Sequence, residues 1–395
     1  MTTPFTRQRA YSLDVVRGLA ASSVLVLHWS LWTSQAVGRD AQSTAISALA
    51  RVLSLGWKGA GIHPGVVIFI VLSGFCIHLP VAAGLERTER SGFWSNFALR
   101  RFVRIYPVYV VGLALGLMSA LIVAEPSITR DGLLISWSGT GALAQLAAIA
   151  GSSWPKDVWA GNGPLSTVAV EMLLYCAYPG LLVLARRIGA TVVSALALLL
   201  YIVWASLAFH GISAELLHGT FLEFLLYWVL GAVAVEFAIY EMRAPVRRTG
   251  RWRVAAIVSA SAYLAYNLLI EVRGAHFGGT LLLAICASIT LGLLVLEETR
   301  LETDSRWRRL LEVCGRIGER SYSLYVVHTP VLVLFIWWWS AASAPVVRWG
   351  SLGLVLLMAE LCFRAVERPC HRLARRLRHD SVANVTSVPA VSQPR

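Results

Sequence analysis

The chain is 395 residues long; 57% of its residues are apolar and only 14% are charged, against about 25% in a typical soluble domain. Its apolar stretches are continuous over about 20 residues each, which predicts an all-α, polytopic membrane protein and argues against a β-barrel, whose strands alternate. The net charge of +13 does not indicate a nucleic-acid-binding protein, because the basic residues gather in alternate loops.

Ten apolar stretches follow one another along the chain, each long enough to cross a membrane. The predicted spans are 13–33, 62–82, 103–124, 165–185, 190–210, 219–240, 253–271, 277–296, 321–340 and 346–366. If the N-terminus is cytoplasmic, 28 of the 35 lysines and arginines lie in cytoplasmic segments and 7 lie outside. This asymmetry favours two cytoplasmic termini. We therefore expect one transmembrane domain over 1–370 and a basic, disordered cytoplasmic tail over 371–395.

The first predicted span carries ionisable residues into an apolar stretch. Arg17 and His28 are eleven residues apart. At ~100° and ~1.5 Å per residue, both lie on one face of a helix, roughly 16 Å apart along its axis. Ionisable groups at membrane depth are costly, and they usually face a protein interior or a watery cavity. We therefore expect His28 to belong to a functional site.

Counting residues from the ends of the spans predicts two polar layers at different depths. The outer layer comprises His28, Glu171 and Glu223. The layer near the cytoplasm comprises Arg17, His78, Arg101, Arg104, His328 and Arg364. Arginines at the cytoplasmic mouth suit an anionic ligand, because guanidinium binds phosphate through paired hydrogen bonds. The structural alternatives stay open: the arginines could anchor a span at the lipid headgroups, and Glu171 could pair with a buried arginine.

Six segments resemble, in order, the motifs of the acyltransferase-3 family of integral membrane O-acyltransferases. They are Leu13–Ala20 with His28 (LDxxRGxA), Ile68–Phe75 (FFxLSGF), Arg100–Pro107 (RRxxRIYP), Gly163–Tyr175 (WSLxxExxFY), Gly318–Pro330 (GxxSYxxYLxHxP) and Glu367–Pro369 (ErP). The fourth segment departs from its motif, because Leu165 precedes Ser166, no tryptophan stands beside them, and Glu171 is five residues after Ser166. The resemblance covers nearly the whole chain.

The resemblance implies ten spans in a bacterial cytoplasmic membrane and a cytoplasmic acyl-CoA co-substrate, with acetyl-CoA the first expectation. The acceptor would be a hydroxyl of a carbohydrate or of a glycosylated natural product. We expect no permanently bound cofactor and no nucleic-acid partner. We also expect no metal, because His28, His78 and His328 lie on separate spans without carboxylates at ligand spacing.

His28 is the candidate general base. Transfer of an acyl group from a thioester to an alcohol requires removal of the hydroxyl proton, and the unperturbed pKa of histidine lies near neutrality. Glu171 is expected to orient the imidazole, as a carboxylate does in other acyl-transfer sites. A serine nucleophile, Ser73 in the LSGF segment, is a competing route; the glycine beside it favours tight packing instead.

The other candidate site residues lie nearer the cytoplasm. Asp14 is expected to pair with Arg17, three residues on, and to hold that end of the helix. Arg101 and Arg104 share a helix face and are expected to bind the phosphates of coenzyme A. His328 is expected to line the donor route or to contact the acyl group.

Other functions remain open at this stage. A proton-coupled secondary transporter of an anionic or sugar-like solute also buries histidine, glutamate and arginine. The absence of a detectable inverted repeat argues against it. A sensor or scaffold would not need the arginine and histidine stripe. Among enzymes, a succinyl-group transferase for periplasmic glucans and an acylase of macrolide-type antibiotics are both compatible with the motifs.

Two outer segments, 34–61 and 125–164, are expected to shape acceptor recognition, because they cover the His28 end of the first span. Their tryptophans could stack on sugar rings, or they could belong to the interfacial aromatic belt, which we favour. These tryptophans are Trp57, Trp137, Trp154 and Trp159.

Overall fold

A computed structural model gives the structure of the chain. It describes residues 10–37, 48–49, 52–53, 62–86, 88–89, 91–123, 139–147, 161–209, 220–243, 249–269, 276–301, 305–339 and 341–386. These residues form helices and no strand, which confirms the predicted all-α class. The helices are α1 (Tyr11–Val37), α3 (Pro64–Ala82), α4 (Phe93–Ile122), α5 (Gly139–Leu146), α6 (Leu165–Ile188), α7 (Ala190–Phe209), α9 (Phe221–Arg243), α10 (Thr249–Leu269), α11 (His276–Glu298), α12 (Arg306–Gly318), α13 (Ser321–Trp338), η4 (Val346–Gly350), α14 (Ser351–Cys362), η5 (Phe363–Glu367) and α15 (Arg368–Thr386).

Within the described ranges, nine helices are long and apolar enough to cross a membrane. They coincide with nine of the ten predicted spans, so the chain is a polytopic membrane protein. The remaining span, 253–271, is helical as α10 but falls outside that set, since polar side chains such as Arg253 and Asn267 interrupt its apolar run. The cytoplasmic placement of both termini stays a prediction.

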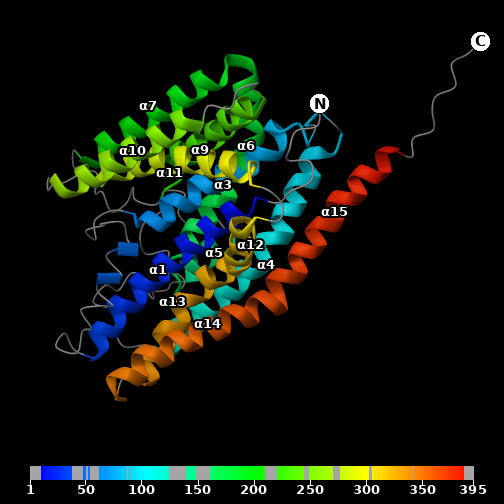
Figure 1. The fold of residues 1–395 in the computed structure, drawn as a ribbon. Helices are drawn as coiled ribbons and strands as arrows, with labels where there is room; N and C mark the ends of the chain where they lie inside the picture. Colours follow the sequence, from blue (N-terminus) through cyan, green and yellow to red (C-terminus); the bar gives the residue numbers. More distant parts are fainter. Residues whose placement is uncertain are drawn as a thin grey trace, which may run out of the picture.

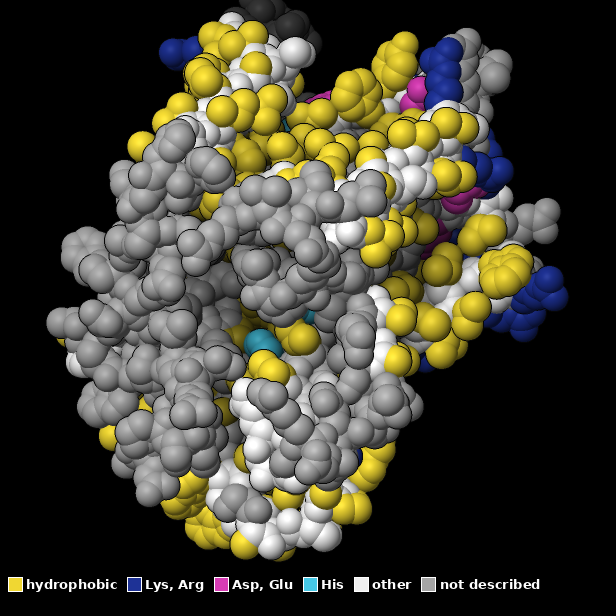
Figure 2. All heavy atoms as spheres, turned by 90° about the vertical axis from the view of Figure 1, so that its left-hand side faces the viewer, with side chains coloured by type: hydrophobic (Ala, Val, Ile, Leu, Met, Phe, Trp, Pro, Cys, Tyr) yellow, Lys and Arg dark blue, Asp and Glu magenta, His cyan; other side chains and the backbone are white. Residues whose placement is uncertain are grey.

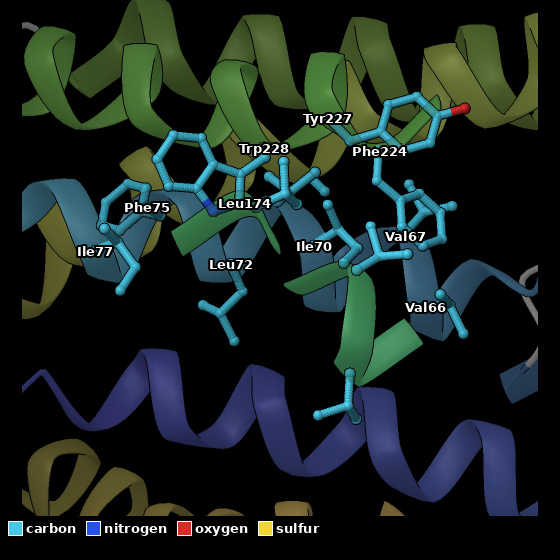
Figure 3. Close-up of a cluster of buried hydrophobic side chains, with 14 of the residues drawn as sticks. Val66, Val67, Ile70, Leu72, Phe75, Ile77, Leu174, Phe224, Tyr227 and Trp228 are labelled. Carbon is cyan, nitrogen blue, oxygen red and sulfur yellow. The ribbon is translucent and has the colours of Figure 1, made fainter. Parts of the chain in front are cut away.

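Helix α3 occupies the middle of the bundle. It contacts α1 on one side and α9 and α11 on the other, and Figure 1 shows it between these two groups of helices. Figure 3 shows side chains of α3 meeting those of α9, with Phe75 beside Trp228 and Val67 below Phe224. All four side chains are buried. The core of the bundle is therefore built around α3, most of whose residues are buried.

Glycines allow α3 and α9 to approach closely. A Cβ on Gly74 would lie 2.0 Å from the carbonyl oxygen of Trp228, and one on Gly231 would lie 2.0 Å from that of Val71.

We predict that Gly74→Ala destabilises the protein by about 2 kcal/mol or more, because backbone rather than a flexible side chain must move. Gly353→Ala is the matched control: Gly353 lies in α14 and has nothing within 4 Å of a new Cβ, so we expect no loss of stability and a gain of up to about 1 kcal/mol, because alanine is favoured over glycine within a helix. Unfolding in detergent measures both, and equal stability of the two variants would contradict the packing.

A carboxylate from α11 fixes the start of α1. Glu298 accepts hydrogen bonds from the backbone N–H groups of Tyr11, at 2.8 Å, and Ser12, at 3.0 Å. The Ser12 hydroxyl also donates to it, at 2.5 Å. The first N–H groups of a helix lack partners within the helix and favour negative charge. Glu298 therefore joins the last turn of α11 to the first turn of α1.

The first turns of α1 pack against α12 rather than against a long span. A Cβ on Gly318, the last residue of α12, would lie 1.8 Å from the carbonyl oxygen of Asp14. A Cβ on Gly18 would lie 2.9 Å from Cα of Gly318. This contact sets the height of α1 relative to α13, which begins at Ser321.

The last predicted span and the beginning of the predicted tail form one continuous rod. Two π-helical turns, η4 and η5, flank α14, and α15 continues from η5 to Thr386. The predicted disordered tail over 371–395 is therefore wrong for 371–386. The reason is packing: α15 contacts α4, the Asn96 side chain donates to the carbonyl oxygen of Leu377 at 3.3 Å, and Cys370, His371 and Ala374 lie half-buried at helical spacing.

Candidate active site

Two histidines from different helices meet inside the bundle. Nδ1 of His28 on α1 lies 2.9 Å from Nε2 of His328 on α13. The two rings are nearly parallel, at 14°, with centroids 5.2 Å apart. Trp32, one turn along α1, also stacks on His28, with the ring centroids 4.9 Å apart. His63, just before α3, lies within electrostatic reach of His28.

His328 is itself held in place. It is 1% exposed, and its Nδ1 lies 2.7 Å from the carbonyl oxygen of Tyr325 in the preceding turn. The hydroxyl of Thr329 lies 3.2 Å from its Nε2. One ring nitrogen is thus bound to backbone and the other faces His28, so the orientation of this ring follows from α13 itself.

The contact between α1 and α12 explains why the two histidines meet. Gly18 and Gly318 touch, and His28 and His328 each lie ten residues further along the chain. Helices α1 and α13 pack together, and each helical residue adds ~1.5 Å, so both imidazoles reach the same depth. The prediction that placed His328 in a separate cytoplasmic layer is therefore wrong. It took residue 13 as the inner end of the first span, although the first turns of α1 lie beside α12.

Glu171 does not contact His28. It accepts a short hydrogen bond from the hydroxyl of Tyr175, one turn along α6, and Tyr175 in turn accepts one from Ser73 of α3 at 3.0 Å. Glu171 and Tyr175 both lie within electrostatic reach of Arg17. Of the two predictions for Glu171, the structure agrees with proximity to a buried arginine and not with orientation of the imidazole.

Arg17 stands at the centre of a second polar cluster. Its Nη1 donates to Asp14 at 2.6 Å, which confirms the predicted pair. Its Nη2 donates to the sulfur of Cys76 at 3.6 Å. We call Arg17, Arg101 and Arg104, with Asp14, Glu171, Tyr175 and Cys76, the arginine cluster.

The two arginines of α4 face this cluster, as predicted. The guanidinium of Arg101 lies over the rings of Phe97 and Tyr175, at 5.5 and 5.6 Å from their centroids. Arg104 lies within electrostatic reach of the guanidinium groups of Arg101 and Arg17. Three guanidinium groups at close quarters repel one another, so an anionic ligand would be favoured there.

Three residues of the predicted polar layers lie elsewhere. Glu223 is fully buried beside Tyr227, whose hydroxyl is 3.4 Å from Oε1 of Glu223 and also donates to Thr280 at 2.8 Å, between α9 and α11. His78 lies between Tyr178, at 3.0 Å, and Glu236, at 2.6 Å. Arg364 pairs with Glu360 at 2.6 Å and is largely exposed. These residues are bound in contacts away from the histidine pair.

Sequence reasoning missed two participants. Cys76 lies in an apolar stretch and none of the sequence motifs singles it out, yet it contacts Arg17. Glu367, 1% exposed, accepts from the backbone N–H of Ser323 at 3.0 Å and from its hydroxyl at 2.5 Å. It lies within electrostatic reach of Arg17 and Arg104. Its place in the last motif was the available signal.

Figure 2 views the end of the bundle that lies at the left of Figure 1. A histidine side chain is visible there in a hollow beside hydrophobic side chains, and most lysines and arginines in view lie at the edges of this face, away from the hollow. The tryptophans expected to shape acceptor recognition, Trp57, Trp137, Trp154 and Trp159, lie outside the described residues.

Comparison with known proteins decides the family. A profile of the acyltransferase-3 family, described as an acyltransferase domain, matches residues 10–364. The chain belongs to the acyltransferase-3 family. It is 25% identical over 395 residues to acyltransferase MdmB of Streptomyces mycarofaciens, with 94% of each chain covered. It is 27% identical over 322 residues to the exopolysaccharide production protein ExoZ of Rhizobium meliloti (strain 1021), covering 79% of this chain and 90% of that one. No solved structure matches the chain.

Family membership makes this chain an acyltransferase, which confirms the predicted enzyme class. These findings support an acyltransferase and do not support the secondary transporter, which the buried charges alone had left open. As an acyltransferase-3 protein with nine apolar helices in its described part, the enzyme is a multi-pass membrane protein.

Proposed function

We propose that this acyltransferase-3 protein moves an acyl group, in the first instance acetyl, from cytoplasmic acyl-CoA to a hydroxyl group of a carbohydrate or glycosylated natural product, in a bacterial cytoplasmic membrane. His28 is the general base. The observation that carries this proposal is the contact of 2.9 Å between His28 and His328, because it leaves one nitrogen of a membrane-embedded imidazole for the substrate.

The hydrogen-bond chain assigns the tautomers. A carbonyl oxygen only accepts, so Nδ1 of His328, 2.7 Å from the Tyr325 oxygen, carries the hydrogen. Neutral His328 then presents Nε2 as an acceptor, and Nδ1 of His28 donates to it. Nε2 of His28 is left with its lone pair. In this assignment His328 is a positioning residue and does not bind the co-substrate.

The reaction needs one proton acceptor and no covalent enzyme intermediate. The acceptor hydroxyl gives its proton to Nε2 of His28 as its oxygen attacks the carbonyl carbon of the thioester. The carbon–sulfur bond then breaks, coenzyme A leaves as a thiolate, and the imidazolium returns the proton to that sulfur. Ser73 is not required as a nucleophile, and its hydroxyl is engaged with Tyr175.

The arginine cluster is the proposed site for the phosphates of coenzyme A. Arg101 and Arg104 project from α4 towards Arg17, and guanidinium groups bind phosphate through paired hydrogen bonds. Asp14 holds Arg17 from the same helix, at 2.6 Å. The phosphates would lie below the histidine pair, and the pantetheine arm would carry the thioester from the cluster towards His28.

We predict that Arg104→Ala raises KM for acetyl-CoA about tenfold or more with kcat little changed, because a hydrogen bond to a charged group is worth roughly 1.5–3 kcal/mol. Arg187→Ala, which removes an exposed arginine at the end of α6, is the matched control and should leave KM unchanged. Steady-state kinetics with varied acetyl-CoA measures both. A fall in kcat at constant KM would place Arg104 in the chemistry instead.

The relatives support the acceptor class. ExoZ is named for exopolysaccharide production, and MdmB is named an acyltransferase, which agrees with a carbohydrate-bearing acceptor and an acyl donor. The side from which the donor enters follows from the charge asymmetry of the loops.

The test uses oriented vesicles. Inside-out membrane vesicles that contain the protein should release free thiol from acetyl-CoA when glycosylated acceptors are supplied, and right-side-out vesicles should not, because coenzyme A does not cross the bilayer. Thiol release in neither orientation, across several acyl-CoA donors and a broad acceptor panel, would contradict the proposal. Release only in right-side-out vesicles would overturn the assigned donor side.

A further inference from the structure

A basic cleft lies outside the proposed active site, where α12 and the turn into α13 meet the end of α14 and the start of α15. Its volume is about 250 Å³. The lining residues are Arg316, Glu319, Arg320, Glu360, Phe363, Arg364 and Arg368. Four arginines against two glutamates give the cleft an excess of positive charge, which favours an anionic occupant.

One carboxylate organises two of the arginines. Glu360 accepts from Nε of Arg320 at 2.5 Å and from Nε of Arg364 at 2.6 Å. Both contacts to Glu360 use Nε of the arginine, and Nη1 of Arg320 also donates to the carbonyl oxygen of Arg316, at 2.5 Å. The guanidinium of Arg320 also lies over the ring of Phe363, at 4.8 Å. Arg368 makes no ion pair within the part of the chain that the structure describes.

The cleft is bordered by exposed apolar rows. On α12, four large apolar side chains lie exposed at helical spacing: Trp307, Leu310, Val313 and Ile317. The opposite side of α12 packs against α1 through Gly315 and Gly318. On α14, Leu357 and Leu361 are exposed in successive turns, and Arg364 follows them on the same side.

An amphipathic helix with one apolar face exposed and basic residues beside it is typical of a helix that lies at the membrane surface. Basic pockets between membrane helices, at the depth of the lipid headgroups, bind acidic lipids. A lipid fits both features, because its phosphate would meet the arginines while its acyl chains would follow the exposed leucines. A soluble nucleotide phosphate would use only the charges.

We propose that this cleft binds the phosphate of an anionic phospholipid, so that α12 and the start of α15 are anchored to the lipid leaflet that they face. The site is separate from the histidine pair and the arginine cluster, and it does not depend on the proposed acyl transfer.

The test is lipid binding to the purified full-length protein in neutral detergent, followed by native mass spectrometry with phosphatidylglycerol and phosphatidylcholine. Wild type should bind the first phosphatidylglycerol at least tenfold more tightly than phosphatidylcholine. Arg368→Ala should weaken phosphatidylglycerol binding about fivefold, the effect of one basic residue near an anionic lipid surface, and leave phosphatidylcholine unchanged. Arg368 makes no described ion pair, so the variant breaks none.

Arg372→Ala, one turn further along α15 and exposed, is the matched control and should bind as wild type does. Equal binding of the two lipids by wild type would overturn the proposal. It would also be overturned if Arg368→Ala and Arg364→Ala both bound phosphatidylglycerol as tightly as wild type does. Displacement of phosphatidylglycerol by free coenzyme A in simple competition would show that the cleft takes a nucleotide phosphate, and the lipid assignment would fail.

Discussion

Replacing His28 by alanine is expected to lower kcat for acceptor-dependent thiol release from acetyl-CoA by about 10²–10⁴-fold, the usual contribution of a general base. The variant removes the only group that the proposed mechanism uses to take the hydroxyl proton. It also leaves His328 without the donor at 2.9 Å. KM for acetyl-CoA should change little, because the phosphates are assigned to the arginine cluster.

The control for this prediction is a second buried histidine. His78 contacts Tyr178 and Glu236, and His78→Gln keeps hydrogen-bonding atoms in that place, so activity should remain near that of wild type. Thermal unfolding in detergent establishes that His28→Ala is folded. If a folded His28→Ala turned over as fast as wild type, the base would have to be another residue.

The second large effect is expected at His328, and here two roles can be separated. His328→Phe keeps a ring but removes the acceptor for Nδ1 of His28, which leaves a half-buried donor without this partner. Such a loss costs about 1–3 kcal/mol, or roughly 5- to 150-fold in rate if it falls on the transition state. We therefore expect kcat to fall by that factor while KM for acetyl-CoA is unchanged.

His328→Gln provides the conservative variant, because a glutamine oxygen can accept from Nδ1 of His28 and should restore part of the lost kcat. A residue that only packs α13 would show no such rescue. The opposite pattern, a raised KM for acetyl-CoA with kcat unchanged, would support the role in the donor route that the sequence predicted.

The fold was largely predictable because its main signal is local. Continuous apolar runs predict membrane helices, and each of the ten predicted spans is a helix. The exceptions have physical causes. The helical part of the tail depends on packing of α15 against α4, which no local pattern shows. Helix α10 is less apolar than the other spans because polar residues interrupt it.

The site was predictable in its members and not in its arrangement. The motifs identified His28, Arg17, Arg101, Arg104 and His328 as candidate site residues. The Asp14–Arg17 pair was predicted from the spacing of the two residues within one helix. Relative depth between helices depends on where they touch. The close contact of glycines between α1 and α12 sets the depth of the two histidines along the bundle, and it places them side by side rather than in separate layers. Such contacts join residues about 300 positions apart and leave no periodic signal.

The same limitation explains Glu171. Its position in the fourth motif placed it on the correct helix, and depth counting placed it near His28. In the structure it bonds to Tyr175, one turn away, and lies beside Arg17. A carboxylate between a tyrosine and an arginine supports the geometry of the arginine cluster and has no direct contact with the base.

The central claim is direct transfer from acyl-CoA to an acceptor hydroxyl with His28 as base. Its most direct test is to incubate the purified wild-type protein with radiolabelled acetyl-CoA and a library of glycosylated acceptors, and then to separate acceptor from denatured protein. Direct transfer predicts label in an ester on the acceptor, in amounts equal to the coenzyme A released, and no label on the protein. Label retained on His28, Ser73 or Cys76, and passed to the acceptor on a second addition, would contradict it.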